Sequence, residues 1–159
     1  EHVETYLAIQ NMRFDNRYRF TNLVPEEFLD CSILKLTLQP LVENAIKHGF
    51  SRTFGDEEIQ VRAQADKDDL VIQVADNGVG ITPDNLERIH RKLEHADEAG
   101  RGNGHNSIGI VNISDRIRLE YGDGYGLKIY PNQPRGTVVE LRIPRNGNMI
   151  ENNDMAERK

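Results

Sequence analysis

The chain has 159 residues, of which 37% are hydrophobic and 29% are charged. This composition is typical of one soluble globular domain, and it excludes a fibrous repeat or a chain that is disordered throughout. The one cysteine, Cys31, can form no disulfide within the chain and leaves no cysteine-based zinc site. The formal net charge of −6 disfavours binding to nucleic acid or to an anionic membrane, so local groups would have to hold any polyanionic ligand.

The hydrophobic pattern predicts helices and strands in a clear order. It predicts a helix over residues 1 to about 20, a short edge strand over 19–24, a helix from 37 or 38 to 48, and a hairpin of strands at 59–65 and 70–75. It then predicts a helix over 83–93 capped by Thr82, a loop over 94–106, a helix over 108–121, and strands at 127–130 and 137–143. Strand pairs separated by helices predict a two-layer α/β sandwich, with helices on one face of a mixed, mostly antiparallel sheet.

The first segment whose side chains could bind a ligand is residues 43–49. It reads ENAIKHG and ends the second predicted helix. Asn44, Lys47 and His48 lie three and four positions apart, so they share one face of that helix. An amide oxygen can bind a hard cation, and the two basic side chains can contact phosphate oxygens. The alternative is a capped helix end, where basic residues favour the negative pole of the helix dipole.

The second segment, residues 76–81, reads DNGVGI and follows a predicted strand. Gly78 and Gly80 would let the backbone approach a flat ligand, while the carboxylate of Asp76 accepts a hydrogen bond from an exocyclic amine. The alternative is a tight turn between a strand and a helix, which the Asp-Asn-Gly sequence also favours.

The third segment, residues 100–112, is a glycine-rich loop that leads into a helix. Its backbone N–H groups and the positive field at the helix N-terminus could together hold a polyphosphate. No Gly-Lys-Ser/Thr sequence follows, so it is not a Walker loop. A flexible linker is the alternative.

The three segments in this order, with Gly136 and Thr137 opening a late strand, resemble the ATP-binding domain of the GHKL superfamily. Residues 43–49 resemble its N box, 76–81 its G1 box and 107–112 its G2 box. Residues 6–14, 38–44 and 112–117 are further similar to sensor histidine kinases of the LytS/YesM type. The resemblance implies the Bergerat ATP-binding fold, with a connector helix over 1–22, the catalytic domain over 23–144, an ATP lid at about 94–106 and a polar, disordered tail over 145–159.

The resemblance also implies a role for each matched residue. Asp76 would accept from the adenine amine, Thr137 would assist through water, and the base would lie against Gly78, Gly80 and Ile81. Asn44 would coordinate Mg²⁺, Lys47 and His48 would contact the phosphates, and Glu43 would be the base that helps a histidine attack the γ-phosphate. The lid and the triphosphate site would be formed by Gly102, Gly104, Ser107, Ile108, Gly109, Ile110 and Asn112.

Two positions depart from the family pattern. Ser107 stands where many GHKL proteins have the first glycine of the G2 box, which would stiffen the lid hinge. Pro40 stands four residues before Asn44, where ATP-hydrolysing relatives have a catalytic glutamate, so we expect poor intrinsic ATPase activity. The resemblance places no phosphoacceptor at any of the histidines of the chain, which are His2, His48, His90, His95 and His105.

We therefore expect the chain to be a piece of a longer kinase that binds ATP and Mg²⁺ without labelling itself. Its expected partners are the phosphoacceptor histidine helix of the same kinase and a cognate response regulator, with no nucleic acid and no direct membrane contact. Its expected location is the cytoplasmic side of a membrane-anchored bacterial protein. Two alternatives stay open, which are an anti-sigma-factor serine kinase of the same superfamily and a nucleotide-sensing module without transfer activity.

Overall fold

The computed structural model describes residues 2–14, 17–31, 33, 37–50, 55–94 and 108–145. The expected lid, with Gly102, Gly104 and Ser107, lies outside the described residues beyond Glu94. The expected tail lies outside them beyond Arg145.

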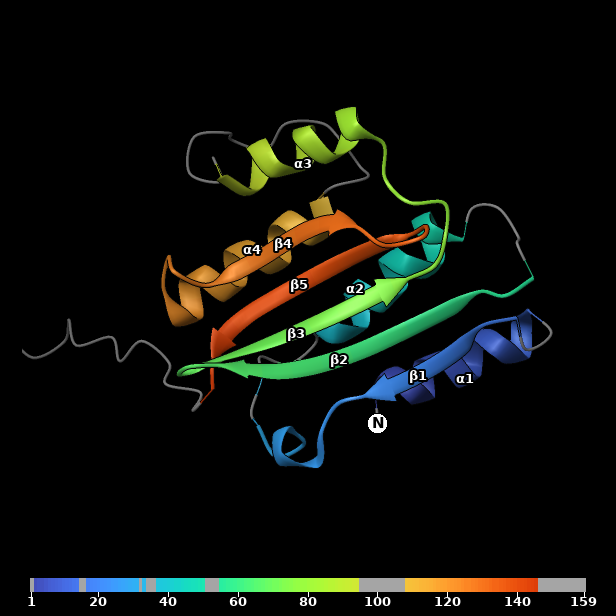
Figure 1. The fold of residues 1–159 in the computed structure, drawn as a ribbon, viewed down its shortest axis with the longest axis horizontal. Coiled ribbons are helices and arrows are strands. Elements are labelled where there is room, and N and C mark those ends of the chain that lie inside the picture. The colour runs from blue at the N-terminus through green and yellow to red at the C-terminus, as the bar shows by residue number, and fades with distance from the viewer. Residues whose placement is uncertain are drawn as a thin grey trace, which may run out of the picture.

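A five-stranded mixed sheet forms one layer of the domain (Figure 1). Its strands are β1 (Arg19–Leu23), β2 (Glu58–Asp66), β3 (Asp69–Asp76), β4 (Gly126–Pro131) and β5 (Thr137–Pro144), in the spatial order β1-β2-β3-β5-β4. Strand β1 pairs with β2 in parallel, and the other three pairings are antiparallel. The predicted hairpin is β2–β3, where the polar residues between the strands make the tight turn.

The helices gather on one side of this sheet, as predicted. They are α1 (His2–Arg13), the short 3₁₀ helix η1 (Glu26–Phe28), α2 (Leu38–Asn44) with its π-helical continuation η2 (Ala45–Gly49), α3 (Pro83–Glu94) and α4 (Ile108–Tyr121). In Figure 1, α1, α2 and α4 lie behind the sheet and α3 lies past the β4 edge. The arrangement is the two-layer α/β sandwich that the sequence predicts.

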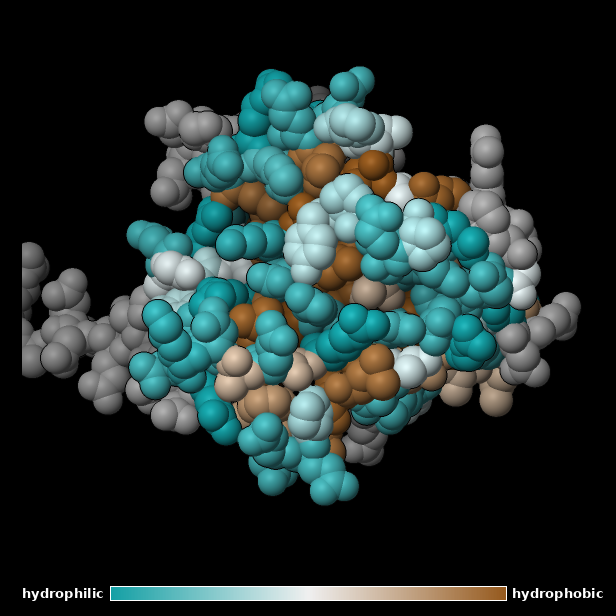
Figure 2. Space-filling view, in the orientation of Figure 1, coloured by the Kyte–Doolittle hydropathy of each residue, from teal (hydrophilic) through white to brown (hydrophobic). Residues whose placement is uncertain are grey.

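The core lies between the sheet and these helices because alternate residues of each strand point to that side. In β2 these are Ile59, Val61 and Ala63, and the helices contribute Leu41 and Ile117. The opposite face of the sheet is polar and open. Figure 2 views that face and shows hydrophilic side chains over much of it, with hydrophobic patches between them.

The first helix is shorter than predicted. It ends at Arg13, and the chain then turns back to form β1 from Arg19. The amide of Asn11 causes this reversal, because its Oδ1 accepts from the N–H of Tyr18 at 2.8 Å and its Nδ2 donates to the carbonyl of Tyr18 at 2.8 Å. The Tyr18 ring is buried and stacks on Phe50, which fixes the turn on the core. Amphipathic spacing continued past Arg13 in the sequence, but this contact ends the helix.

The second helix confirms the predicted start and end but not its regularity. It begins at Leu38 and places Pro40 in the first turn, where a missing N–H leaves no intrahelical bond unmade. From Ala45 to Gly49 it widens into a π-helical turn that the sequence pattern did not predict. Thr82 caps α3 as predicted, since its Oγ1 accepts from the N–H of Asn85 at 3.4 Å.

Candidate functional site

A cavity of about 240 Å³ lies between the helices and the sheet, and residues from the second helix, the strands, α3 and α4 line it. Seven of the predicted site residues line this cavity: Asn44, His48, Asp76, Gly80, Ile81, Ile110 and Thr137. The three segments singled out in the sequence therefore meet at one place in the fold.

Asp76 ends β3 and places a buried carboxylate at this cavity, with the residue only 5% exposed. The backbone N–H of Gly78 donates to its Oδ1 at 2.9 Å, and the N–H of Thr137 also hydrogen-bonds the carboxylate. Burial outweighs these two bonds and raises the pKa of Asp76 from its ordinary 3.8 to about 6. At neutral pH the group is thus mainly an ionised acceptor, which suits a ligand that brings an N–H donor.

Glycines allow three backbone segments to pack tightly around Asp76. A Cβ on Gly78 would lie 2.1 Å from the carbonyl oxygen of Gly49, and a Cβ on Gly136 would lie 1.9 Å from the carbonyl oxygen of Asp76. The N–H of Val79 donates to the Gly49 carbonyl at 2.8 Å, which joins the first segment to the second. A Cβ on Gly49 would lie 2.8 Å from Asp76 Oδ1. Gly49 and Gly136 are therefore required by close approach, whereas the sequence suggested only a helix stop and a strand start for them.

Asn44 also lines the cavity, and it lies against the first turn of α4. It is half-buried, and a Cβ on Gly109 would lie 3.6 Å from its Nδ2 and 3.8 Å from its Oδ1. An amide that could bind a cation thus lies beside the N-terminal turn of a 14-residue helix, where a negatively charged ligand is favoured.

Other predicted residues do not line the cavity. Lys47 and Asn112 are exposed, Gly109 and Gly78 contribute backbone beside it, and the side chain of Ile108 is outside the described part of the structure. Glu43 is the neighbour of Asn44 but occupies another side of the helix. Its Oε1 accepts from Gln39 Nε2 at 2.9 Å. Burial, and then the negative charge of Glu43, raise the pKa of Tyr6 on α1, so Glu43 lies near α1.

The wall of the cavity that α3 provides was not predicted from the sequence. Asn85, Arg88 and Ile89 line it, and Arg88 Nη2 donates to Asn85 Oδ1 at 3.1 Å. Their spacing of three and four places them on one face of α3, a signal that was present in the sequence. The remaining lining residues, to which the sequence reasoning assigned no ligand contact, are Leu41, Ala45, Gly49, Val74, Thr82, Ile129 and Val139.

No group of three or more His, Cys, Asp or Glu in the described ranges could hold a metal ion, so Asn44 would need phosphate oxygens or water to complete a coordination shell. Among the helices that the structure describes, none has the length and apolar character needed to cross a membrane.

The family described as "Histidine kinase-, DNA gyrase B-, and HSP90-like ATPase" matches residues 30–147, and the chain belongs to it. Among curated relatives, it is 37% identical to Sensor histidine kinase YesM of Bacillus subtilis (strain 168) over 142 residues, which are 89% of this chain and 22% of that protein. It is 31% identical to Sensor protein kinase HptS of Staphylococcus aureus (strain USA300) over 143 residues, which are 90% of this chain and 26% of that protein. These matches confirm the resemblance to GHKL domains of YesM-type sensor kinases, and the chain spans about a quarter of the length of these relatives.

Solved structures confirm the fold. The chain resembles the nucleotide-free catalytic domain of histidine kinase ThkA with a TM-score of 0.60 at 15% identity, covering 91% of this chain and 90% of that one. It resembles the mycobacterial sensor histidine kinase MprB with a TM-score of 0.53 at 18% identity, covering 90% and 92%. At these identities the likeness establishes the architecture and not the roles of residues.

Proposed function

We propose that the chain is the ATP-binding catalytic domain of a sensor histidine kinase, which transfers the γ-phosphate of ATP to a histidine outside these residues. The observation that carries the proposal is the meeting of Asp76, Asn44 and the N-terminal turn of α4 around one cavity. This arrangement offers an acceptor for a base at one end and an anion-binding helix terminus at the other, in a chain that belongs to an ATPase family.

At the base end, the carboxylate of Asp76 accepts from the adenine amine. Gly80 and Ile81 lie along the base, Gly78 orients the carboxylate through its N–H, and Thr137 assists through water. The apolar wall of the cavity, from Val74 to Ile129 and Val139, gives the flat ring a surface to pack against.

At the phosphate end, Asn44 helps to hold Mg²⁺, which neutralises charge on the triphosphate when bound. Lys47 and His48 contact phosphate oxygens. The N–H groups of Ser107, Ile108, Gly109 and Ile110, with Asn112, hold the triphosphate under a lid that contains Gly102 and Gly104. Positioning and charge neutralisation then supply most of the catalysis in phosphoryl transfer.

Glu43 is proposed as the base for the attacking histidine. Because it lies near α1 and does not line the cavity, the phosphoacceptor helix would approach from the α1 side of the domain. The relatives are named as sensor kinases, so we extend the proposal to a cognate response regulator as partner and to a cytoplasmic position in a membrane-anchored protein.

The binding part of the proposal is tested by titration calorimetry with Mg-ATP. Asp76→Asn should weaken binding by about 1–3 kcal/mol, because it loses a charge-assisted hydrogen bond, and Asn44→Asp by a similar amount, because it loses the amide donor and adds a negative charge beside the triphosphate. Unchanged affinity in both variants contradicts the site assignment.

The transfer part is tested in the full-length kinase with labelled ATP. Acid-labile phosphate that disappears in Glu43→Gln supports a histidine kinase. Acid-stable phosphoserine would identify a serine kinase of the same superfamily, and ATP binding without any phosphohistidine would identify a nucleotide-sensing module.

A further inference from the structure

We propose that Asn132 and Arg135, in the turn between β4 and β5, are positioning residues that hold the backbone of Asp76 and Asn77 and thereby set the nucleobase preference of the site. The inference rests on the proposed function, since it concerns how Asp76 meets an adenine. Neither residue lines the cavity, and no motif in the sequence pointed to them.

Asn132 acts on the carbonyl of Asp76. The pairing of β3 with β5 ends at Ala75 and Val138, so the Asp76 carbonyl lies beyond the last residue of that ladder. The Nδ2 of Asn132 donates to this carbonyl at 2.8 Å, while its Oδ1 accepts from the N–H of Gln133 at 2.9 Å. Because both ends of the amide are used, the side chain has one orientation, and it replaces the missing backbone partner.

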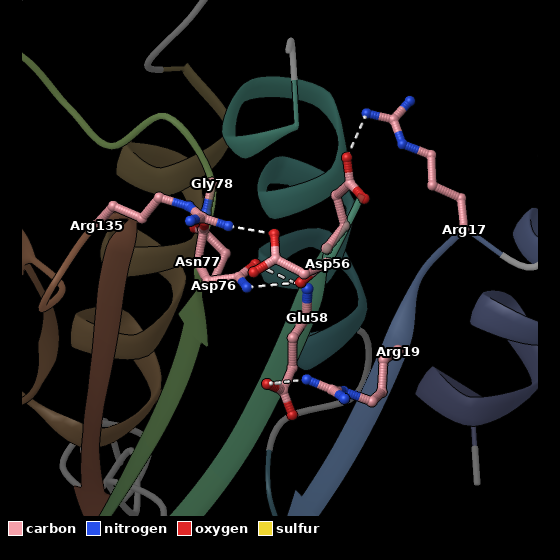
Figure 3. Close-up of polar contacts among 9 residues, drawn as sticks. Arg17, Arg19, Asp56, Glu58, Asp76, Asn77, Gly78 and Arg135 are labelled. Atoms are coloured by element: carbon pink, nitrogen blue, oxygen red, sulfur yellow. Dashed lines mark hydrogen bonds and ion pairs between the residues drawn. The ribbon is translucent and has the colours of Figure 1, made fainter. Parts of the chain in front are cut away.

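Arg135 acts on the next residue, Asn77. Its Nε donates to the Asn77 carbonyl at 2.6 Å, and its Nη2 pairs with the carboxylate of Asp56 (Figure 3). The side chain of Asn77 is held as well, because its Oδ1 accepts from the N–H of Glu58 at 2.8 Å and its Nδ2 donates to the Asp56 carbonyl at 2.7 Å. The strand ends that carry Asp56, Asn77 and Arg135 are thus tied to one another.

These contacts lie on the side of Asp76 that faces away from the ligand cavity. A second, polar cavity of about 290 Å³ is lined by Asp56, Asn77, Asn132 and Arg135, and Asp76 is the one residue that lines both cavities. The carboxylate faces the first cavity while its backbone is held from the second. A carboxylate that must meet an amine within hydrogen-bond distance is sensitive to sub-ångström shifts of that backbone.

Three substitutions separate positioning from a general effect on stability. Asn132→Asp keeps the size and the Oδ1 acceptor but sets an oxygen against the Asp76 carbonyl, and Asn132→Ala removes the donor without adding charge. Arg135→Lys keeps the charge opposite Asp56 but loses the fork that also reaches Asn77. Gln133→Ala is the matched control, because Gln133 is an exposed residue of the same turn.

Titration calorimetry with Mg-ADP and Mg-IDP, at a temperature well below unfolding, measures the preference. IDP lacks the exocyclic amine, so the ratio of the two affinities reports the contact with Asp76. We expect the ADP affinity and the ADP:IDP ratio to fall about 3- to 12-fold in the Asn132 variants and in Arg135→Lys, the loss typical of one hydrogen bond, and to stay within twofold in Gln133→Ala.

The outcomes separate the inference from the proposed function. A lower melting temperature with an ADP:IDP ratio within twofold of the wild type would mean that the turn only stabilises the fold, which overturns the inference and leaves the proposed function standing. A wild-type chain that binds ADP no better than IDP overturns the proposed function, and this inference with it. If Asn132→Asp fails to fold, Asn132→Ala and Arg135→Lys decide the matter.

Discussion

Replacing Asp76 by asparagine should stabilise the free domain at neutral pH while weakening its binding of nucleotide. The buried carboxylate has a pKa of about 6 in the folded chain and an ordinary value of 3.8. At one pKa unit per about 1.36 kcal/mol, the ionised group costs the folded state about 3 kcal/mol at neutral pH. Asparagine carries no charge, so it avoids this cost.

The sign of the pH dependence follows from the direction of the shift. Because the folded pKa is raised, the folded state binds more protons than the unfolded state between pH 3.8 and about 6. The stability that the protonated Asp76 side chain contributes is therefore fully present below about pH 3.8. It is lost as the pH rises through the folded pKa of about 6, and it does not change further above that pH. Carboxylates with lowered pKa values, such as Glu58 and Asp66, act in the opposite direction in both proteins and cancel in the comparison.

Urea unfolding of the wild type and of Asp76→Asn between pH 4 and 8 measures this difference. The amide oxygen can accept from only one of the two N–H groups, of Gly78 and Thr137, and the N–H₂ then points toward the other. This lost contact costs about 1 kcal/mol at every pH. The difference in the free energy of unfolding should therefore move by roughly 2.4 kcal/mol in favour of asparagine from pH 4 to pH 7. Parallel pH profiles for the two proteins would refute the claim that burial of Asp76 dominates its pKa.

Nucleotide binding should favour the ionised form of Asp76. A ligand that donates an N–H to Asp76 favours the ionised form and lowers its pKa. Near pH 6, where Asp76 is about half protonated in the free chain, Mg-ADP binding should release a fraction of a proton. Calorimetry in buffers of different ionisation enthalpy measures the release, and Asp76→Asn is the control that should abolish it.

Three further substitutions test other contacts. Arg17→Met should lower the free energy of unfolding by about 1–3 kcal/mol in urea, because it removes a guanidinium 3.1 Å from Glu57, whose side chain is 1% exposed; a loss below about 0.5 kcal/mol would contradict this. Gly78→Ala should lower the free energy of unfolding by about 2 kcal/mol or more and abolish Mg-ATP binding in calorimetry, since the Cβ would lie 2.1 Å from a backbone oxygen. Gly124→Ala is the control, because a Cβ there meets nothing within 4 Å and should change neither quantity. Arg88→Ala should weaken Mg-ATP binding by about 1 kcal/mol with an unchanged melting temperature if its charge acts on the ligand, and equal affinities would exclude that role.

Local sequence signals predicted the parts of the fold that local chemistry controls. The turn between β2 and β3, the Thr82 cap and the start of α2 near Pro40 each depend on residues within a few positions of one another. The predicted end of α1 was wrong, because the helix end depends on a contact between Asn11 and the backbone of Tyr18 across the chain reversal after Arg13. Hydrophobic spacing alone does not contain that contact.

In the candidate site, too, the features that depend on local sequence were predicted and those that depend on tertiary contacts were not. The motifs around Asn44 and Asp76 were readable in the sequence. The sequence also placed Asn85, Arg88 and Ile89 on one face of a helix, but it did not show that this face meets the cavity, because tertiary contacts fix the position of α3. His90 Nε2 lies 2.8 Å from the carbonyl oxygen of Ile129, and Arg118 donates from α4 to the carbonyl of Leu93. The neighbours Glu43 and Asn44 face different sides because successive helical residues are about 100° apart, a consequence that sequence adjacency conceals.

The placement of charged pairs explains how a chain with a net charge of −6 could hold a polyanion. Asp56, Glu57 and Asp66 are each paired with an arginine of another segment, on the β1–β2 side or on the open face of the sheet. These pairs neutralise acidic groups away from the cavity. At the cavity itself, the anion would meet the N-terminus of α4 and the side chain of Arg88, so the local field and not the net charge decides the ligand.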